Sequence, residues 1–335
     1  MSALLDAYQV LLLDLDGTVY HGPDVVGDAG EVVGEVKRRH LAVRFITNNA
    51  SRAPEEVANQ LTGIGVPAKP TDVSTSGQAA AAVLAGEVAD GDHVLVLGTE
   101  ALAEEIRARG LRAVQRADDG VAAVVQGLSK RTGWAELAEA CLALRAGSGW
   151  VACNADPVLP TEQGMVPGNG AMVAALTAAT GRTPTVAGKP ERPLFDQAVA
   201  SCGGGTALVV GDRLDTDIAG ANNAELDGML VLSGVTTAAD LLAAPPEHRP
   251  RYLANDLRGV LRPAELLEIG ERVGWQVRVG DGAIEVAARG NIPGEPLELL
   301  RAMCAAWWRA SGNTVPEIRA ADEPAGTALA ELGLG

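Results

Sequence analysis

The stretch that decides the fold is QVLLLDLDGT, residues 9–18. Its first half is an apolar run that ends at an aspartate. A second apolar run over residues 41–46 ends at Thr47, and a third over residues 207–210 is followed by a glycine and Asp212. Short continuous apolar runs of this kind are typical of strands that are buried on both faces.

Helical spacing over residues 31–40 separates the first two runs. Strands that alternate with helices predict an α/β fold, here a doubly wound parallel sheet with helices on both faces. Ligands of such sheets bind beyond the carboxyl ends of the strands. Because all three runs end in polar residues, we expect the functional site at that edge of the sheet.

A second α/β series interrupts the first between residues 78 and 184. Both of its ends must return to one core, because the run at 207–210 needs the first sheet. We therefore predict an inserted α/β domain at 78–184 and a core made of 1–77 and 185–243. The expected strands of the insertion are 93–97, 121–126 and 150–153, and its expected helices are 100–109, 134–145 and 172–180.

The composition changes near residue 244. Three prolines within residues 245–250 predict a linker at 244–260, followed by a small α+β domain at 261–335. In that tail we expect a helix near 263–272, strands at 276–279 and 284–288, and a helix at 296–310.

The strand–strand–helix order of the tail resembles part of an acetyltransferase fold. The tail is too short for the whole fold and lacks an Arg/Gln-x-x-Gly-x-Gly loop, so acetyl transfer is not expected. An interaction module, an oligomerisation arm and a regulatory domain stay open as its role. Trp307 and Trp308 are expected to pack within the tail, against the inserted domain or against a second subunit.

Charge and composition narrow the class of protein. The chain has 335 residues, 47% of them hydrophobic, and its 27 basic and 43 acidic residues give a net charge of −16. Such a surface repels nucleic acids and anionic membranes, so neither is expected as a partner, and an anionic substrate would need local cations. The four cysteines form no CxxC pair and the N-terminus is a poor signal peptide, which favours a cytoplasmic location.

The motif at residues 14–18 places two carboxylates, Asp14 and Asp16, directly after a buried strand. Both can face one pocket if the chain curls at Gly17. One can then act as a metal ligand and as a nucleophile that forms an acyl phosphate, and the other as an acid and base. The alternative is an ordinary solvated turn, because Asp-Gly is common in turns.

Three further groups follow the other strands or lie on a constrained loop. Thr47-Asn48-Asn49 offers a hydroxyl, a backbone N–H and an amide to phosphoryl oxygens, or forms an Asn-rich turn. Lys189 lies between glycine and proline and could neutralise charge, or be a surface lysine. Asp212 is suited to ligate Mg²⁺ and Asp217 to orient the ligands.

These four groups together resemble the haloacid dehalogenase (HAD) superfamily of phosphatases, in order and in context. The form Gly-Asp-Arg-Leu-x-Thr-Asp-Ile at residues 211–218 is similar to the NagD-like and p-nitrophenyl phosphatase branch, which carries a C2-type cap inserted after the second motif. The resemblance covers about residues 5–240. It implies a Rossmann-like core, a cap at 78–184 that sets substrate specificity, and Mg²⁺ as the cofactor.

The resemblance also implies roles for the residues. Asp14 is then the nucleophile and a Mg²⁺ ligand. Asp16 protonates the leaving oxygen, deprotonates the attacking water and lends its carbonyl oxygen to the metal. Asp212 is then the remaining metal ligand, and Asp217 orients the ligands without binding the metal directly. Thr47, Asn48 and Lys189 bind the phosphoryl group.

Substrate choice is expected to depend on the cap loop that starts at residue 154. Asn154 and Asp156 match the substrate-contacting loop of the branch, although an Asx turn before Pro157 is the alternative. The resemblance to actinobacterial members with a similar tail makes glycerol 3-phosphate the first choice of substrate. Pyridoxal phosphate, phosphoglycolate and a nucleotide stay open, as do a phosphotransferase, a non-catalytic phosphometabolite sensor and a homo-oligomer.

Overall fold

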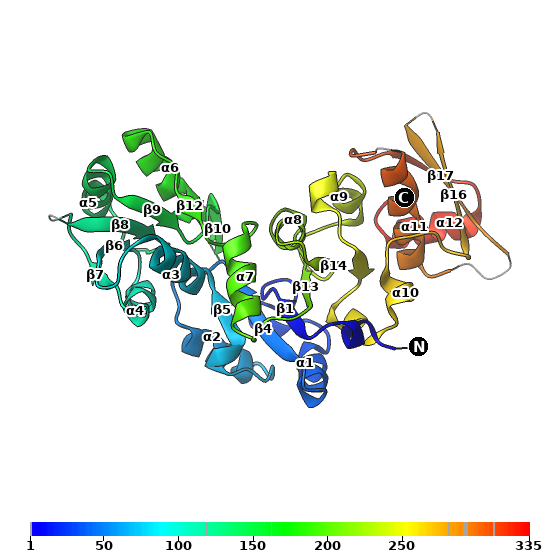
Figure 1. Cartoon of the computed structure of the whole chain (residues 1–335). Helices are drawn as coiled ribbons and strands as arrows, with labels where there is room; N and C mark the ends of the chain where they lie inside the picture. Colours follow the sequence, from blue (N-terminus) through cyan, green and yellow to red (C-terminus); the bar gives the residue numbers. More distant parts are fainter. Residues whose placement is uncertain (1, 118–119, 162, 281, 291–293, 311) are drawn as a thin grey trace. The chain divides into compact units, whose positions relative to one another are not determined.

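The computed structural model of the chain describes residues 2–117, 120–161, 163–280, 282–290, 294–310 and 312–335. They form two compact units. The first unit comprises Met1–Val43, Ile64–Val66 and Gly205–Gly335, and the second comprises Arg44–Gly63 and Pro67–Gly204. Each unit contains parallel strands flanked by helices (Figure 1), so the predicted α/β class is confirmed.

The sheet of the first unit consists of four parallel strands. Its strands are β1 (Val10–Leu13), β13 (Ala207–Gly211), β14 (Asp227–Val231) and β15 (Tyr252–Ala254), and each pairs with the next. All residues of β1 and β13 are buried, as expected for strands covered on both faces. The register sets Leu13 opposite Val210, so β1 and β13 end side by side and the residues that follow them leave the sheet at one edge.

Helices and short turns cover this sheet. They are η1 (Leu4–Ala7), α1 (Ala29–Arg38), the π-helical turn η3 (Leu214–Ile218), α8 (Ala219–Asn223), α9 (Ala238–Leu242), η4 (Pro246–His248) and η5 (Leu257–Leu261), and a hairpin joins β2 (Tyr20–His21) to β3 (Asp24–Val25). The buried residues of α1 are Ala29, Val32, Val33 and Val36. This spacing gives the helix one apolar face, as its sequence predicts.

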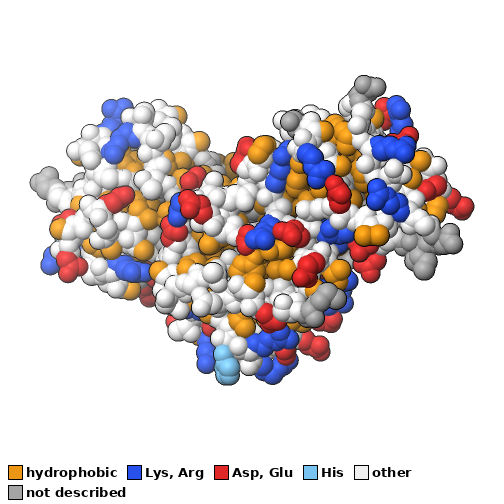
Figure 2. Space-filling view, turned by 45° about the vertical axis from the view of Figure 1, so that its right-hand side comes forward, with side chains coloured by type: hydrophobic (Ala, Val, Ile, Leu, Met, Phe, Trp, Pro, Cys, Tyr) orange, Lys and Arg blue, Asp and Glu red, His pale blue; other side chains and the backbone are white. Residues whose placement is uncertain are grey.

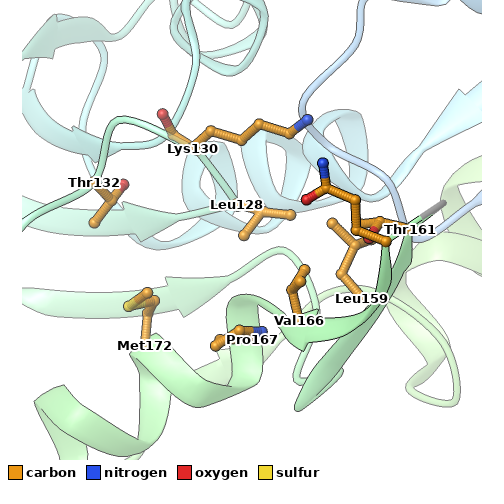
Figure 3. A pocket seen from close by; sticks show the side chains of 10 residues that line it. Leu128, Lys130, Thr132, Leu159, Thr161, Val166, Pro167 and Met172 are labelled. Carbon is orange, nitrogen blue, oxygen red and sulfur yellow. The ribbon is translucent and has the colours of Figure 1, made fainter.

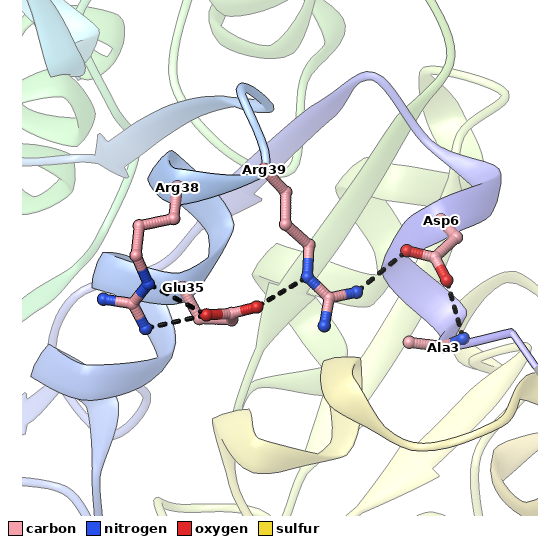
Figure 4. Close-up of polar contacts among 5 residues, drawn as sticks. All are labelled: Ala3, Asp6, Glu35, Arg38 and Arg39. Carbon is pink, nitrogen blue, oxygen red and sulfur yellow. Dashed lines mark hydrogen bonds and ion pairs between the residues drawn. The ribbon is translucent and has the colours of Figure 1, made fainter.

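The outer face of α1 is joined to η1 by a chain of charges, shown in Figure 4. Glu35 accepts hydrogen bonds from Arg38 and Arg39, and Arg39 reaches Asp6 with 3.0 Å between Nη1 and Oδ1. Water screens such exposed pairs and they add little stability, so the apolar face carries most of the stability of the helix. Figure 2 shows acidic and basic side chains interspersed in the same way over one face of the molecule.

The tail of the first unit has its own three-stranded sheet. β16 (Trp275–Gly280) runs antiparallel to β17 (Ala283–Ala288), and β17 runs parallel to β18 (Glu317–Ala320). The helices are α10 (Ala264–Leu267), α11 (Pro296–Arg309) and α12 (Glu323–Glu331). The last strand and the last helix were not predicted.

The helix predicted near 263–272 is wrong in its length, because α10 ends at Leu267. The next residue, Glu268, is extended and forms an isolated bridge with Tyr252, and the N–H of Ile269 donates to the carbonyl of Arg251. The backbone therefore bonds to the edge of the sheet instead of continuing the helix. The segment expected to be a linker likewise contains β15.

The tail and the strands of the first unit share one apolar core. Trp275 and Trp307 are buried in it together with Leu230 of β14 and Leu242 of α9. The buried guanidinium of Arg301 donates to the carbonyl of Leu253 at 2.7 Å. Trp307 therefore packs inside its own unit, and not against the inserted domain.

Trp308 and Arg249 tie the tail to the segment before β15. The guanidinium of Arg249 lies 5.0 Å from the centre of the Trp308 ring, and Arg249 donates to the carbonyl of Gly312 at 2.8 Å. The indole N–H of Trp308 donates to the carbonyl of Leu242. Trp308 therefore packs against the core of its own unit.

The second unit contains a parallel sheet of five strands in the order β12-β9-β8-β6-β7. Its strands are β6 (His93–Leu97), β7 (Arg112–Val114), β8 (Val121–Gln126), β9 (Gly149–Ala152) and β12 (Thr185–Val186), and α4 (Glu100–Ala108), α5 (Trp134–Arg145) and α6 (Asn169–Thr180) flank it. Trp150 and Val124 pack against Leu144 of α5 and Leu176 of α6. Because β12 belongs to this sheet, the inserted series extends two residues beyond the predicted bound at 184.

The second unit contains further strands and helices. β4 (Ala42–Thr47) runs parallel to β5 (Val73–Thr75), and β10 (Val158–Thr161) forms an antiparallel hairpin with β11 (Gly164–Pro167). The helical elements are α2 (Pro54–Gly63), η2 (Pro70–Asp72), α3 (Ser76–Glu87) and α7 (Arg192–Ala200). Within the described residues, no helix has both the length and the apolar character needed to cross a bilayer.

Candidate active site

Three aspartates come together at the carboxyl edge of the sheet in the first unit. One carboxylate oxygen each from Asp14, Asp212 and Asp217 lie within 4.8 Å of one another. Asp212 and Asp217 are fully buried. Asp14 and Asp212 follow the neighbouring strands β1 and β13, and Asp217 lies in the turn η3. The strand ends expected to carry the chemistry therefore do place these carboxylates together.

Glycines make room for the Asp212 carboxylate. Gly17 has φ of +86°, and a Cβ there would lie 2.5 Å from Oδ2 of Asp212. A Cβ on Gly234 would also overlap this carboxylate. The N–H of Val235 donates to the same Oδ2 at 2.7 Å. The curl at Gly17 thus brings the chain against Asp212, and a backbone donor fixes the direction of its carboxylate.

Asp217 is held in a similar way. The N–H of Arg213 donates to its Oδ2 at 3.1 Å, and a Cβ on Gly211 would overlap its side chain. By contrast, the Asp215 carboxylate pairs with the exposed Arg213 guanidinium and lies outside the cluster. Within residues 211–218, the Asp217 carboxylate therefore points into the cluster and the Asp215 carboxylate points to the surface.

This set of donors fits a hard divalent cation. All three ligands are carboxylate oxygens, which Mg²⁺ and Ca²⁺ prefer, and two of them are buried. Burying several like charges together costs free energy unless a cation balances them. Asp217 is part of the cluster, whereas the sequence placed it behind the ligands. The side chain of Asp16 is not in it, which leaves the expected metal contact of Asp16 to its carbonyl oxygen.

Asp16 faces solvent on the hairpin side of the motif. Its side chain is 76% exposed, and its Oδ1 lies 4.0 Å from Nδ1 of His21 on β2. The N–H of Gly17 donates to the carbonyl of Tyr20, which folds the hairpin back toward Asp16. An exposed carboxyl next to an aspartate cluster is placed to exchange protons with water, as an acid and base must.

Asn48 and Lys189 are held together in the second unit, although 141 residues separate them. Oδ1 of Asn48 accepts from the N–H of Lys189 at 2.7 Å, and Nδ2 of Asn48 donates to the carbonyl of Lys189 at 3.0 Å. The lysine is 5% exposed, its peptide bond to Pro190 is cis, and a Cβ on Gly188 would lie 2.6 Å from Oδ1 of Asn48. Lys189 is therefore a buried residue whose main chain is held by Asn48, and not a surface lysine.

The Asn48 amide also donates to Oδ2 of Asp156 at 3.1 Å. Both N–H groups of this amide thus have protein partners, and any contact of Asn48 with a phosphoryl group is left to its backbone N–H. Thr47 ends β4, and its Oγ1 accepts from the N–H of Asn49. The sequence predicted that Asn48 binds the phosphoryl group, with a backbone N–H and an amide as the donors of this motif, and the structure uses the Asn48 side chain to hold the main chain of Lys189.

Asn154 also supports this loop. Its amide donates to the carbonyl of Asn48 at 2.7 Å, and its Oδ1 accepts from the N–H of Asp156, which is the Asx turn considered from the sequence. Two further buried residues complete the support. Ser76 donates to the carbonyl of Asn48 at 2.6 Å, and the Asn169 amide donates to the carbonyl of Asn154 at 2.7 Å.

Cys153 borders this set without taking part in its chemistry. Its carbonyl lies where a Cβ on Gly188 would be, and its side chain is fully buried. Burial raises the pKa of the Cys153 thiol to about 12. At neutral pH the thiol is therefore protonated, which excludes it as a nucleophile.

One cavity of the second unit is lined by residues that follow β8 and by the β10–β11 hairpin. It measures about 570 Å³, and Figure 3 shows Lys130 along one side with Leu128, Leu159, Val166 and Met172 around it. A second cavity of about 420 Å³ lies near β6 and α5. None of the nine predicted site residues lines either cavity.

Family models match three parts of the chain. A model described as haloacid dehalogenase-like hydrolase matches residues 11–112, and one described as HAD-hydrolase-like matches residues 186–260. A model of a GCN5-related N-acetyltransferase like domain matches residues 272–334. The last match agrees with the resemblance drawn from the strand–strand–helix order of the tail.

The chain is similar to characterised and solved proteins over its whole length. It is 48% identical to the D-glycerol 3-phosphate phosphatase of Mycobacterium tuberculosis over 343 residues, which cover 100% of this chain and 96% of that protein. A crystal structure of the glycerol phosphate phosphatase from M. tuberculosis with magnesium superposes with a TM-score of 0.94, at 49% identity and full coverage of both chains. The 5′-nucleotidase YutF of Bacillus subtilis is 37% identical over 69% of this chain and 90% of its own.

Proposed function

The chain belongs to the haloacid dehalogenase-like hydrolases, and on that premise we propose that it hydrolyses glycerol 3-phosphate. It is a phosphoric monoester hydrolase of this family, with Mg²⁺ as cofactor. The substrate is supported by the 48% identity to the D-glycerol 3-phosphate phosphatase, which extends through the tail as well as the catalytic part. The single observation that carries the proposal is this full-length identity, and the aspartate cluster at the strand ends agrees with it.

Asp14, Asp212 and Asp217 supply the carboxylates that would hold Mg²⁺, and the carbonyl oxygen of Asp16 is proposed as a further ligand. When bound, the ion balances the buried negative charge and supplies positive charge next to a phosphoryl group. The remaining chemistry belongs to the side chains of this protein. It needs little more than positioning and charge stabilisation, because phosphoryl transfer has a loose transition state.

Asp14 is the proposed nucleophile. Its carboxylate attacks phosphorus and releases the alcohol, and water then hydrolyses the acyl phosphate. Asp16 protonates the leaving oxygen and afterwards takes a proton from the water. This assignment is supported by the environment of the two groups, because Asp14 joins the aspartate cluster while Asp16 is exposed to water.

Lys189 is proposed to balance the charge of the phosphoryl group, with the Thr47 hydroxyl and the Asn48 backbone N–H as hydrogen-bond donors. Support comes from the burial of Lys189 and from its two hydrogen bonds with the Asn48 amide. A buried ammonium is a strong local cation in a protein whose net charge is −16. Asp156 is proposed as the residue of the cap loop that contacts the substrate, and Asn154 as its support.

We also propose the cellular setting of the protein. The four cysteines, all within the described residues, are free thiols, which supports a reducing compartment such as the cytoplasm. A small phosphorylated metabolite is the partner, nucleic acid and membranes are not, and a homo-oligomer stays open. The tail is proposed to stabilise the core through its shared apolar cluster and not to transfer acetyl groups.

A panel of phosphate esters tests the substrate. Purified protein with Mg²⁺ is assayed for phosphate release from glycerol 3-phosphate, pyridoxal phosphate, phosphoglycolate and a nucleoside monophosphate. The highest kcat/KM is expected for glycerol 3-phosphate. A higher value for the nucleotide, which the YutF relative makes the strongest rival, would overturn the proposed substrate while leaving the phosphatase class intact.

A further inference from the structure

The five-stranded sheet of the second unit changes its direction of winding between β6 and β8. Its order is β12-β9-β8-β6-β7, and all neighbouring strands are parallel. From β6 the chain crosses to β7 on one side, and from β8 it crosses to β9 on the other (Figure 1). Ligands of such sheets bind beyond the carboxyl ends of the strands at the point where the winding changes direction.

The cavity of about 420 Å³ lies at this point. Leu97 and Gly98, at the end of β6 and directly after it, line one part of the cavity, and Ser129 and Thr132, in the loop between β8 and α5, line another. Its volume is within the range of small-molecule sites, roughly 300–1,000 Å³. None of the residues proposed for phosphoryl transfer is among the described residues that line it.

Two arginines that line this cavity have no partner within the described part of the chain. Arg116 follows β7, Arg131 lies in the loop before α5, and both are exposed. The turn that carries Arg131 is fixed, because its N–H donates to Oγ of Ser129 at 3.2 Å and the N–H of Thr132 donates to the carbonyl of Ser129. The main chain beside the cavity therefore needs little reordering when a ligand binds.

Two acidic side chains line the same cavity, and they hold the main chain instead of the arginines. Oε2 of Glu136 accepts from the N–H of Gly133 at 2.9 Å, and Oε2 of Glu139 accepts from the N–H of Ala117 at 2.6 Å. The second bond joins α5 to the segment that carries Arg116. The cavity therefore offers positive donors and negative acceptors that are not paired with each other.

We propose that this cavity is a second binding site of the protein, and that its ligand is a sugar phosphate or another phosphorylated polyol. The guanidinium groups of Arg116 and Arg131 bind the phosphate, because their N–H groups match the geometry of its oxygens. The carboxylates of Glu136 and Glu139 accept hydrogen bonds from hydroxyl groups of the ligand. Two positive and two negative side chains balance, so the site suits one phosphate with neutral hydroxyls better than a polyanion.

The lining also argues against two other ligands. A nucleotide gains much of its affinity when its base stacks on an aromatic ring, and no aromatic side chain is among the described residues that line the cavity. An inorganic anion alone would leave the two glutamates without a donor from the ligand. The hydroxyls of Ser129 and Thr132 add neutral hydrogen-bonding groups, which favour a ligand with several oxygens.

Equilibrium dialysis of the full chain with radiolabelled glucose 6-phosphate and ribose 5-phosphate tests the site. EDTA prevents Mg²⁺-dependent turnover of the probe, so the result does not depend on the proposed function. We expect at least one probe to bind saturably at one molecule per chain. Arg116→Gln/Arg131→Gln should raise its Kd about 10-fold or more, because charge-assisted hydrogen bonds to phosphate are lost. This double variant should leave kcat/KM for p-nitrophenyl phosphate unchanged.

Two further variants serve as controls. Arg109→Gln/Arg112→Gln removes the same charge from exposed residues of the second unit that do not line the cavity, and should leave the Kd unchanged. Lys189→Met, at the proposed phosphoryl site, should also keep the binding of the probe. Thermal melting shows whether each variant is folded.

No saturable binding of either sugar phosphate, or a Kd that Arg116→Gln/Arg131→Gln does not change, would overturn the inference. Loss of binding in Lys189→Met would also overturn it, because the probe would then occupy the phosphoryl site. Inorganic phosphate that binds as tightly as the sugar phosphates would overturn the assigned ligand class. Failure of the wild type to release phosphate from any ester with Mg²⁺ would instead contradict the proposed function and leave this inference in force.

Discussion

The aspartate cluster of the first unit and the Asn48–Lys189 set of the second are built by different means. Asp212 is fixed by glycines that leave room for it and by a backbone N–H from the loop after a neighbouring strand. Lys189 is fixed by an amide side chain 141 residues away. The first design depends on short motifs, and the second depends on contacts between distant segments. Mutations in the two sets should therefore have different effects. Mutations in the aspartate cluster should remove the chemical step, and mutations in the Asn48–Lys189 set should misplace Lys189.

The largest effect is expected at the nucleophile. Asp14→Asn removes the attacking carboxylate, so kcat should fall by about 10⁴-fold or more, as when other covalent catalysts lose their nucleophile. Phosphate release from glycerol 3-phosphate measures it. Asp215→Asn, in an acidic motif but outside the cluster, is the control and should keep most of the activity. An active Asp14→Asn enzyme would place the nucleophile elsewhere.

Metal binding sharpens the contrast between the two sets. In the wild type, Mg²⁺ at about 100 times its Kd should stabilise the folded state by about 2.7 kcal/mol. Asp212→Asn should abolish the resulting rise in Tm and most of the activity, while Lys189→Met should lower activity and keep the rise. Thermal melts with Mg²⁺ and with EDTA provide the measurement. A rise that persists in Asp212→Asn would show that the ion binds at other residues.

Asn48→Ala tests the amide set. It leaves the N–H of Lys189 without its partner, which costs about 1–3 kcal/mol, and frees the lysine loop. We expect a lower Tm and a loss of about 10-fold in kcat/KM, since a small misplacement of a binding group has effects of this order. The neighbouring exposed residue gives a matched control, Asn49→Ala, which should change both values far less. Equal effects of the two substitutions would contradict the claim that the Asn48 side chain positions Lys189.

The smallest effect is expected at Asn154. Its amide supports the carbonyl of Asn48, so Asn154→Ala should cost about 1 kcal/mol in the free energy of unfolding. It should lower kcat/KM for all substrates of the panel by a similar factor. Asp156→Ala should instead change their ranking. A change of ranking in Asn154→Ala would return Asn154 to the role of a substrate contact.

The same contrast explains what could be predicted from the sequence. The strands that precede Asp14 and Asp212 were predictable, because continuous apolar runs identify buried parallel strands and their carboxyl ends meet at one edge. The α/β class and the phosphatase family followed from these strands and their motifs. The site residues at these strand ends belong to short motifs that directly follow an apolar run. A short motif of this kind can be recognised from the sequence alone.

The supports of the amide set could not be predicted, because they are contacts between segments far apart in the chain. Nothing near Ser76 indicates that its hydroxyl meets the carbonyl of Asn48, and nothing near Asn48 indicates that its amide is used up by Lys189 and Asp156. The loop after β14, whose Val235 N–H donates to Asp212, had a signal that was missed, because it follows a strand of the same sheet. The short helix α10 shows the same limit, because pairing with the sheet edge overrode its helical pattern.

The central claim is that the Asp14 carboxylate carries the phosphoryl group during turnover. The direct measurement is rapid acid quenching of the enzyme during hydrolysis, followed by peptide mass spectrometry with and without hydroxylamine, which cleaves acyl phosphates. The account predicts a phosphate on the peptide that contains Asp14, removed by hydroxylamine and missing in Asp14→Asn. Turnover without any phosphate on that peptide, or with a phosphate on another residue, would contradict it.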